Sequence, residues 1–207
     1  TAMLHWRLNT KDLKPRPLTT TAFHGYKYDL SKFRGLGAGK EEVARLLAES
    51  KSVAVYDGYA EAGQRALGNR SILFNPLNPQ GRDIVNRIKR REWYRPFAAC
   101  VLEEDAHLYF DIKVASRFMT QCYKVTTDLI PAVTHVDKTC RVQTVVDGHL
   151  YDILQEFKKL TGHGILLNTS FNLAGDPLVE TPQQALDTLA NSELDYLWFP
   201  ETLQLFS

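Results

Sequence analysis

The sequence has only three cysteines and two methionines among its 207 residues, and no long hydrophobic run. Cys100, Cys122 and Cys140 are too widely spaced for a zinc motif or a disulfide framework, which indicates free thiols in a reducing compartment. No apolar stretch approaches the ~18 residues that suggest a membrane span. We therefore expect a cytoplasmic protein that does not bind a membrane.

Several common site motifs are also missing. The six histidines form no His-x-x-x-His pair, so a helix-borne metal site is not expected. No glycine-rich loop ends in the Gly-Lys-Ser/Thr of a Walker A motif. Internal repeats and low-complexity segments are absent from the sequence as well. These absences exclude the simplest zinc-enzyme and P-loop assignments.

The net charge of +1 provides no overall field that would attract nucleic acid or a membrane. The charge is unevenly distributed, however. Residues 61–95 carry eight Lys and Arg against three Asp and Glu, a net charge of +5, and the remainder of the chain carries −4. This basic centre predicts a local binding site for an anion.

Strand-like and helix-like segments alternate along the chain, which predicts an α/β (α+β) fold, a twisted mixed open sheet with flanking helices. We expect an extended N-terminal arm over residues 1–38 and one domain over 39–207. Helices are expected over 40–50, 83–91, 151–160, 181–191 and part of 103–131. Strands are expected over 52–58, 71–74, 97–102, 141–146, 165–167 and 194–199.

The segment 88–97 packs four cations into seven residues, beside aromatics and a proline. An arginine fork and a lysine ammonium are the usual partners of phosphate oxygens. The apolar residues that follow place this segment against the core, which favours Lys89 and Arg95 as anion-binding residues. The alternative is a solvated basic helix face formed by Arg87, Arg90 and Arg91, and we assign this alternative to Arg87 and Arg90.

Residues 168–172, Asn-Thr-Ser-Phe-Asn, follow an apolar run. Ligands of open sheets gather beyond the carboxyl ends of strands. Asn168, Ser170 and Asn172 could hold phosphate oxygens through amide and hydroxyl groups. An ordinary polar turn remains the alternative.

Two further segments contain candidate residues. Glycines over 61–71 allow close backbone approach to a ligand, and Arg65 and Arg70 supply charge, although this signal is weak alone. In the segment 134–143, Arg141 is a candidate contact for phosphate or a carbonyl. His135 and Asp137 alternate with Val136; a structural pair is favoured, and metal ligation or acid–base chemistry remain alternatives.

Four strings together, GQRALGNRSIL, IKRREWYRPFAA, HVDKTCRVQTV and LLNTSFN, make the chain resemble the C-terminal region of the O-carbamoyltransferases. The resemblance extends from about Tyr56 to Phe199. It implies a YrdC-like domain, a type related to domains that make threonylcarbamoyl-adenylate for tRNA modification. Such a domain is understood to join carbamoyl phosphate and ATP, with Mg²⁺, into carbamoyl-adenylate.

By motif, the resemblance assigns Lys89 and Arg95 as the cationic pair and Ser170 with Asn172 as the Ser-x-Asn element. The remaining implied contacts are Arg65, Arg141 and the neighbouring Asn168. The expected catalytic residues are therefore Lys89, Arg95 and Arg141. The expected ATP and carbamoyl phosphate site comprises Arg65, Arg70, Lys89, Arg95, Arg141, Asn168, Ser170 and Asn172.

The chain departs from the family in two ways. Gln64 stands where the family usually has proline before the arginine. The large N-terminal domain of actin-like ATPase type, which carries out the transfer, has no counterpart in this sequence. We expect either that the sequence is a fragment of a longer protein or that a separate chain supplies this domain in trans. A homo-oligomer is possible. Alternative functions are a non-catalytic nucleotide-binding or assembly subunit and an RNA-binding module, although the overall charge argues against nucleic acid.

Overall fold

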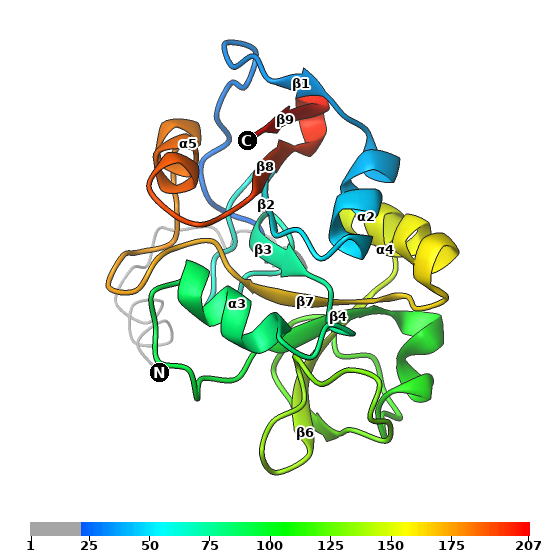
Figure 1. The fold of residues 1–207 in the computed structure, drawn as a ribbon. Coiled ribbons are helices and arrows are strands. Elements are labelled where there is room, and N and C mark those ends of the chain that lie inside the picture. Colours follow the sequence, from blue (N-terminus) through cyan, green and yellow to red (C-terminus); the bar gives the residue numbers. More distant parts are fainter. Residues whose placement is uncertain (1–21) are drawn as a thin grey trace, which may run out of the picture.

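The computed structural model describes residues 22–207, which are built around one mixed open sheet (Figure 1). Among these residues the sheet has nine strands in the order β1-β9-β8-β2-β3-β7-β4-β6-β5. The pairs β2–β8 and β4–β6 are parallel, and the other pairs are antiparallel. The predicted fold class is confirmed. The strands are β1 (Leu36–Gly37), β2 (Val53–Tyr56), β3 (Arg70–Phe74), β4 (Ala98–Leu102), β5 (Cys122–Lys124), β6 (Thr139–Val145), β7 (Ile165–Ser170), β8 (Tyr196–Phe199) and β9 (Gln204–Phe206).

Helices cover both faces of the sheet. They are α2 (Lys40–Ala48), α3 (Gly81–Ile88), α4 (Gly148–Thr161), α5 (Pro182–Ala190) and the 3₁₀ turns η1 (Glu103–Leu108) and η2 (Pro200–Thr202). Helices α2 and α4 lie side by side against one face, and α3 and α5 pack on the other (Figure 1). Within the described residues, no helix is long and apolar enough to cross a bilayer.

The two faces follow from the alternation of side chains along buried strands. In β2, Val53 and Val55 belong to the core beneath α2 and α4, whereas Ala54 and Tyr56 face the core beneath α5. All four residues of this strand are buried. The strand therefore lies in the middle of the sheet and is apolar on both sides, which explains its continuous hydrophobic sequence.

Local signals set several helix boundaries. Thr181 Oγ1 accepts a hydrogen bond from the backbone N–H of Gln184, and Gln184 Oε1 accepts one from the backbone N–H of Thr181. These two bonds form a complete capping box. Gly162 ends α4 at a φ of 81°, in the left-handed region that glycine favours. Both ends lie close to the predicted boundaries.

Three sequence-based expectations are wrong. The helix predicted over 83–91 ends at Ile88, and Arg90 then adopts a φ of 53° that turns the chain away. The helix of uncertain extent expected in part of 103–131 is only the 3₁₀ turn η1, and this segment also contains strand β5, which was not expected. The strand predicted over 165–167 continues to Ser170, because it pairs with β3 and β4 beyond its apolar part, so Asn168 and Ser170 lie within the strand and not after it.

The predicted arm lies partly outside the described residues, which begin at residue 22. Over 22–38 the backbone is mostly irregular, apart from the short strand β1. Leu30 is buried in the core beneath α5, and β1 pairs with β9 at one edge of the sheet. The described part of this segment is therefore packed against the domain. The sequence analysis did not predict strand β9.

Candidate active site

A polar cavity of about 230 Å³ lies where three strands meet. Ala98, at the start of β4, pairs with Asn168 of β7 on one side and with Arg141 of β6 on the other, which places these residues in one row across the sheet. Because β7 runs antiparallel to β4, the cavity lies beyond the carboxyl end of β7 and the amino end of β4. Its lining comprises Gln64, Arg65, Ala66, Arg91, Pro96, Phe97, Ala98, Met119, His135, Arg141, Asn168, Thr169 and Ser170.

The loop before β3 is held by a buried carboxylate. Glu61 Oε1 accepts the backbone N–H groups of Leu67, Asn69 and Arg70 at 2.7, 2.9 and 3.2 Å. Gly68 in this loop has a φ of 126°, and a Cβ there would press against Leu150 at 3.2 Å. The loop is thereby fixed in a conformation that puts Arg65 against the cavity.

Arg65 and Arg141 are the two predicted cationic contacts that the structure brings together. Both line the cavity, and burial together with the charge of Arg141 lowers the pKa of the Arg65 guanidinium. Within the described part of the chain, neither makes an ion pair with a carboxylate. Two arginines that lack acidic partners at one cavity form a site suited to a polyanion.

Lys89 lies behind the cavity wall. Its side chain is 3% exposed, and Nζ donates to Ser170 O at 2.5 Å, Asn172 O at 2.9 Å and Asn172 Oδ1 at 3.0 Å. Ser170 Oγ lies 3.3 Å from Nζ and donates to Asn172 Oδ1 at 2.6 Å. Burial and the charge of Arg91 lower the pKa of Lys89 to about 7. Lys89 thus joins the Ser-x-Asn element into one cluster, in which Ser170 lines the cavity.

Arg91, which the sequence analysis named as part of a possible basic helix face but not as a site residue, lines the cavity. Its guanidinium lies 4.2 Å above the Phe97 ring, and Nε donates to Asn86 Oδ1 at 2.6 Å. Burial and the charge of Arg95 lower its pKa to about 10, so it remains charged at neutral pH. The predicted helix extended to residue 91 and would have kept Arg91 on the helix surface. Because α3 ends at Ile88, Arg91 lies in the following loop and lines the cavity.

Arg95 and Arg70 are not brought to the cavity. The Arg95 side chain is 55% exposed and pairs with Glu92 at 3.1 Å. Arg70 is completely buried and donates to the carbonyl oxygens of Asp57, Asn69 and Gly58. Its guanidinium lies 3.6 Å above the Tyr56 ring. The geometry gives Arg70 a structural position and leaves Arg95 at the surface.

Asn168 is buried and lines the cavity. Its Nδ2 donates to Gln143 Oε1 at 3.0 Å, and Gln143 Nε2 donates to Leu67 O at 2.8 Å. This chain of amides ties β7 and β6 to the loop that carries Arg65. The sequence analysis did not name Gln143, which connects Asn168 to the loop that carries Arg65. Gln143 is buried within β6, a strand that the sequence predicted.

His135 lines the cavity without pairing with Asp137. Its Nε2 donates to Phe97 O at 3.0 Å, and Nδ1 faces Thr139 Oγ1 at 3.3 Å. Asp137 accepts from the backbone N–H and the hydroxyl of Thr139. These contacts build a turn before β6. Among residues 22–207, no group of three His, Cys, Asp or Glu could hold a metal ion.

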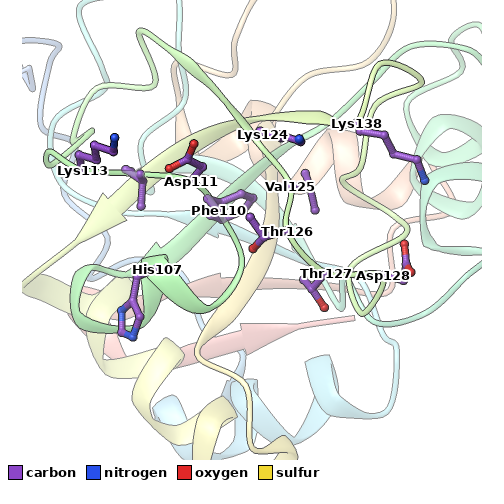
Figure 2. A pocket seen from close by; sticks show the side chains of 11 residues that line it. His107, Phe110, Asp111, Lys113, Lys124, Val125, Thr126, Thr127, Asp128 and Lys138 are labelled. Carbon is purple, nitrogen blue, oxygen red and sulfur yellow. The ribbon is translucent and has the colours of Figure 1, made fainter.

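A larger cavity, of about 800 Å³, lies at the β5 edge of the sheet (Figure 2). Lys113, Lys124 and Lys138 line it together with Asp111 and Asp128. Figure 2 shows these charged groups distributed around the cavity and not converging on one point. Because positive and negative groups are interspersed, we assign the anion site to the smaller cavity, where the cations have no opposing carboxylates.

The mixed open sheet is the fold of the YrdC-like domains. The structure resembles full-length HypF with a TM-score of 0.56 and 19% identity, over 78% of this chain and 27% of HypF. It resembles E. coli YciO with a TM-score of 0.56 and 13% identity, over 81% and 82% of the two chains. At these identities the likeness shows the fold alone.

The chain belongs to the family described as Carbamoyltransferase C-terminus, whose sequence model matches residues 44–204. It is 38% identical over 165 residues to an uncharacterised protein of Methanocaldococcus jannaschii, covering 76% of this chain and 27% of that protein. It is 40% identical over 164 residues to nodulation protein NolNO of Sinorhizobium fredii, covering 74% and 24%. The chain thus spans about a quarter of the length of these relatives.

Proposed function

We propose that this chain forms carbamoyl-adenylate from carbamoyl phosphate and ATP, the activation half of a carbamoyl transfer. The observation that carries this proposal is the cavity at which Arg65, Arg91 and Arg141 gather without opposing carboxylates, next to the hydroxyl of Ser170. Three cations at one cavity suit a reaction between two phosphorylated substrates. Membership of a carbamoyltransferase family supports the identity of the transferred group.

The proposed reaction needs little covalent help from side chains. Water attacks the phosphorus of carbamoyl phosphate, the P–O bond to the carbamoyl oxygen breaks, and phosphate and carbamate form. The carbamate oxygen then attacks the α-phosphorus of ATP, and the bond to pyrophosphate breaks. Arginines and fixed hydrogen-bond donors stabilise the charge that develops at phosphorus, where positioning and electrostatics dominate catalysis.

ATP enters this scheme as its Mg²⁺ complex. In this proposal the ion would be held mainly by the phosphates of the substrate and would neutralise part of their charge. The acceptor hydroxyl and the transfer step belong to a separate actin-like domain or subunit in this proposal, since the chain spans only about a quarter of its relatives. The cytoplasm is the proposed compartment.

Incubation of the chain with ATP, Mg²⁺ and carbamoyl phosphate tests the proposal. Carbamoyl-adenylate decays in water to AMP, so liquid chromatography should show AMP and pyrophosphate only when carbamoyl phosphate is present. ATP binding without AMP formation would favour a non-catalytic nucleotide-binding or assembly subunit. Absence of nucleotide binding would contradict both functions.

An RNA-binding module is a second candidate, because Trp93 and Tyr94 are 71% and 63% exposed and lie between Arg91 and Arg95. Exposed aromatics beside cations can stack unpaired bases. Titration of single-stranded RNA at increasing salt would decide it. Affinity that falls steeply with salt and is lost in Trp93→Ala would support RNA binding, whereas no binding at 50 mM salt would reject it.

A further inference from the structure

A second cavity, of about 390 Å³, adjoins the candidate active site. Four residues line both cavities: Gln64, Arg65, Met119 and Arg141. The two arginines therefore stand at the boundary between the cavities. A ligand that places phosphates on Arg65 and Arg141 could extend into either side.

The two cavities differ in volume. Pockets for ligands of drug size have volumes of roughly 300–1,000 Å³. The first cavity, of about 230 Å³, falls below this range and suits a small anion beside Ser170. The second cavity, of about 390 Å³, falls within it and offers room for a nucleoside.

The lining of the second cavity also suits a nucleoside. Phe118 is 48% exposed, whereas its neighbour Met119 is 2% exposed. Met119 has a φ of 51°, a conformation that is uncommon for residues other than glycine. Leu67 adds apolar surface and Gln64 and Thr120 add polar groups. A half-exposed ring at the edge of a cavity can stack a base, and stacking tolerates different bases.

We propose that this second cavity holds the nucleoside of the nucleotide substrate, with Phe118 as the platform for the base and with Arg65 and Arg141 binding the phosphates at the boundary. The assignment rests on the proposed function for the choice of a nucleotide. It places carbamoyl phosphate in the first cavity, next to Ser170. The two substrates then meet at the arginine pair, where the carbamate oxygen must reach the α-phosphorus.

Calorimetric binding of AMP and of ribose 5-phosphate to the full chain tests this proposal, because the two ligands share the sugar and phosphate and differ in the base. Wild type should bind AMP more tightly. Phe118→Ala should weaken AMP binding about tenfold and leave ribose 5-phosphate binding unchanged. Phe118→Trp keeps a platform and should preserve the preference for AMP.

Leu108→Ala serves as the matched control, because Leu108 is 55% exposed and lines neither cavity. Thermal melting of each variant establishes that it is folded. Equal AMP binding by wild type and Phe118→Ala would overturn the proposal, as would an equal loss for both ligands or no AMP binding by wild type. If Phe118→Ala loses AMP selectively but wild type lacks turnover with carbamoyl phosphate, the nucleoside site stands and the proposed function fails.

Discussion

Arg91 and Arg95 are four residues apart, yet only Arg91 reaches the cavity. The left-handed conformation of Arg90 turns the chain beyond α3, and Asn86 then fixes Arg91 through its side-chain oxygen. Asn86 Nδ2 also donates to the carbonyl oxygens of Trp93 and Arg95. One buried amide thus organises the whole loop and directs one arginine inward.

Replacing these two arginines in turn tests the site. Arg91→Ala should lower the rate of carbamoyl phosphate-dependent AMP formation by about 10²–10³-fold, the usual effect of removing one donor to developing charge. Arg95→Ala should change the rate by less than about twofold, because this side chain is exposed and pairs only with Glu92 in the described chain. The reverse order of effects would restore Arg95 as the catalytic residue that the sequence indicated.

The depressed pKa of Lys89 makes stability depend on pH. Its folded pKa of about 7 lies below the ordinary value of 10.5, so between these values the unfolded state binds more protons. This group alone should therefore raise the free energy of unfolding as pH increases from about 7 to 10.5, by at most about 1.4 kcal/mol per unit. Urea unfolding across this range should show a smaller rise in Lys89→Met. If the free energy of unfolding rose equally with pH in wild type and Lys89→Met, the pKa of Lys89 would not be depressed in the folded protein.

At the scale of elements, the sequence pattern predicted those helices and strands whose bounds depend on residues close together in the chain. The capping box of α5, Gly162 after α4 and the apolar β2 all act within a few residues, and their elements were predicted close to their observed bounds. The continuation of β7 through Ser170 depends on pairing with β3 and β4, which are distant in sequence. The same limit applies to the cavity. The sequence motifs named Lys89 and Ser170, which the structure places in contact with each other, whereas the position of Arg91 depends on where α3 ends.

The edge strand β1 offers a test of whether the segment before α2 belongs to the folded unit. A Cβ at Gly35 would collide with the carbonyl oxygen of Leu205, which is backbone of β9 and cannot yield easily. Gly35→Ala should therefore reduce the free energy of unfolding by about 1–3 kcal/mol. Gly37 has open space around its Cβ position, so Gly37→Ala should stay within about 0.5 kcal/mol of wild type. Equal stability of both variants would mean that this edge contributes little to folding.

At the scale of the whole molecule, charge is concentrated where the proposed chemistry needs it. The chain has a net charge of +1, although residues 61–95 alone carry +5. Those residues supply the loop with Arg65, helix α3 and the loop with Arg91, which all reach the cavity or support it. A concentrated field of this kind attracts phosphorylated ligands to one place without making the whole surface basic.

The proposed function predicts that residues 1–207, assayed alone, release a reactive carbamoyl-adenylate. Hydroxylamine would intercept that product: its nitrogen attacks the carbamoyl carbon, the C–O bond to the adenylate breaks, and hydroxyurea and AMP form. We expect hydroxyurea, detected by mass spectrometry, in amounts that rise with AMP. Omission of ATP controls for direct attack on carbamoyl phosphate, and Arg91→Ala should reduce hydroxyurea and AMP together. Hydroxyurea formed equally without ATP would show that the chain activates no carbamoyl group, whereas AMP without hydroxyurea would show that ATP is cleaved by water instead of by carbamate.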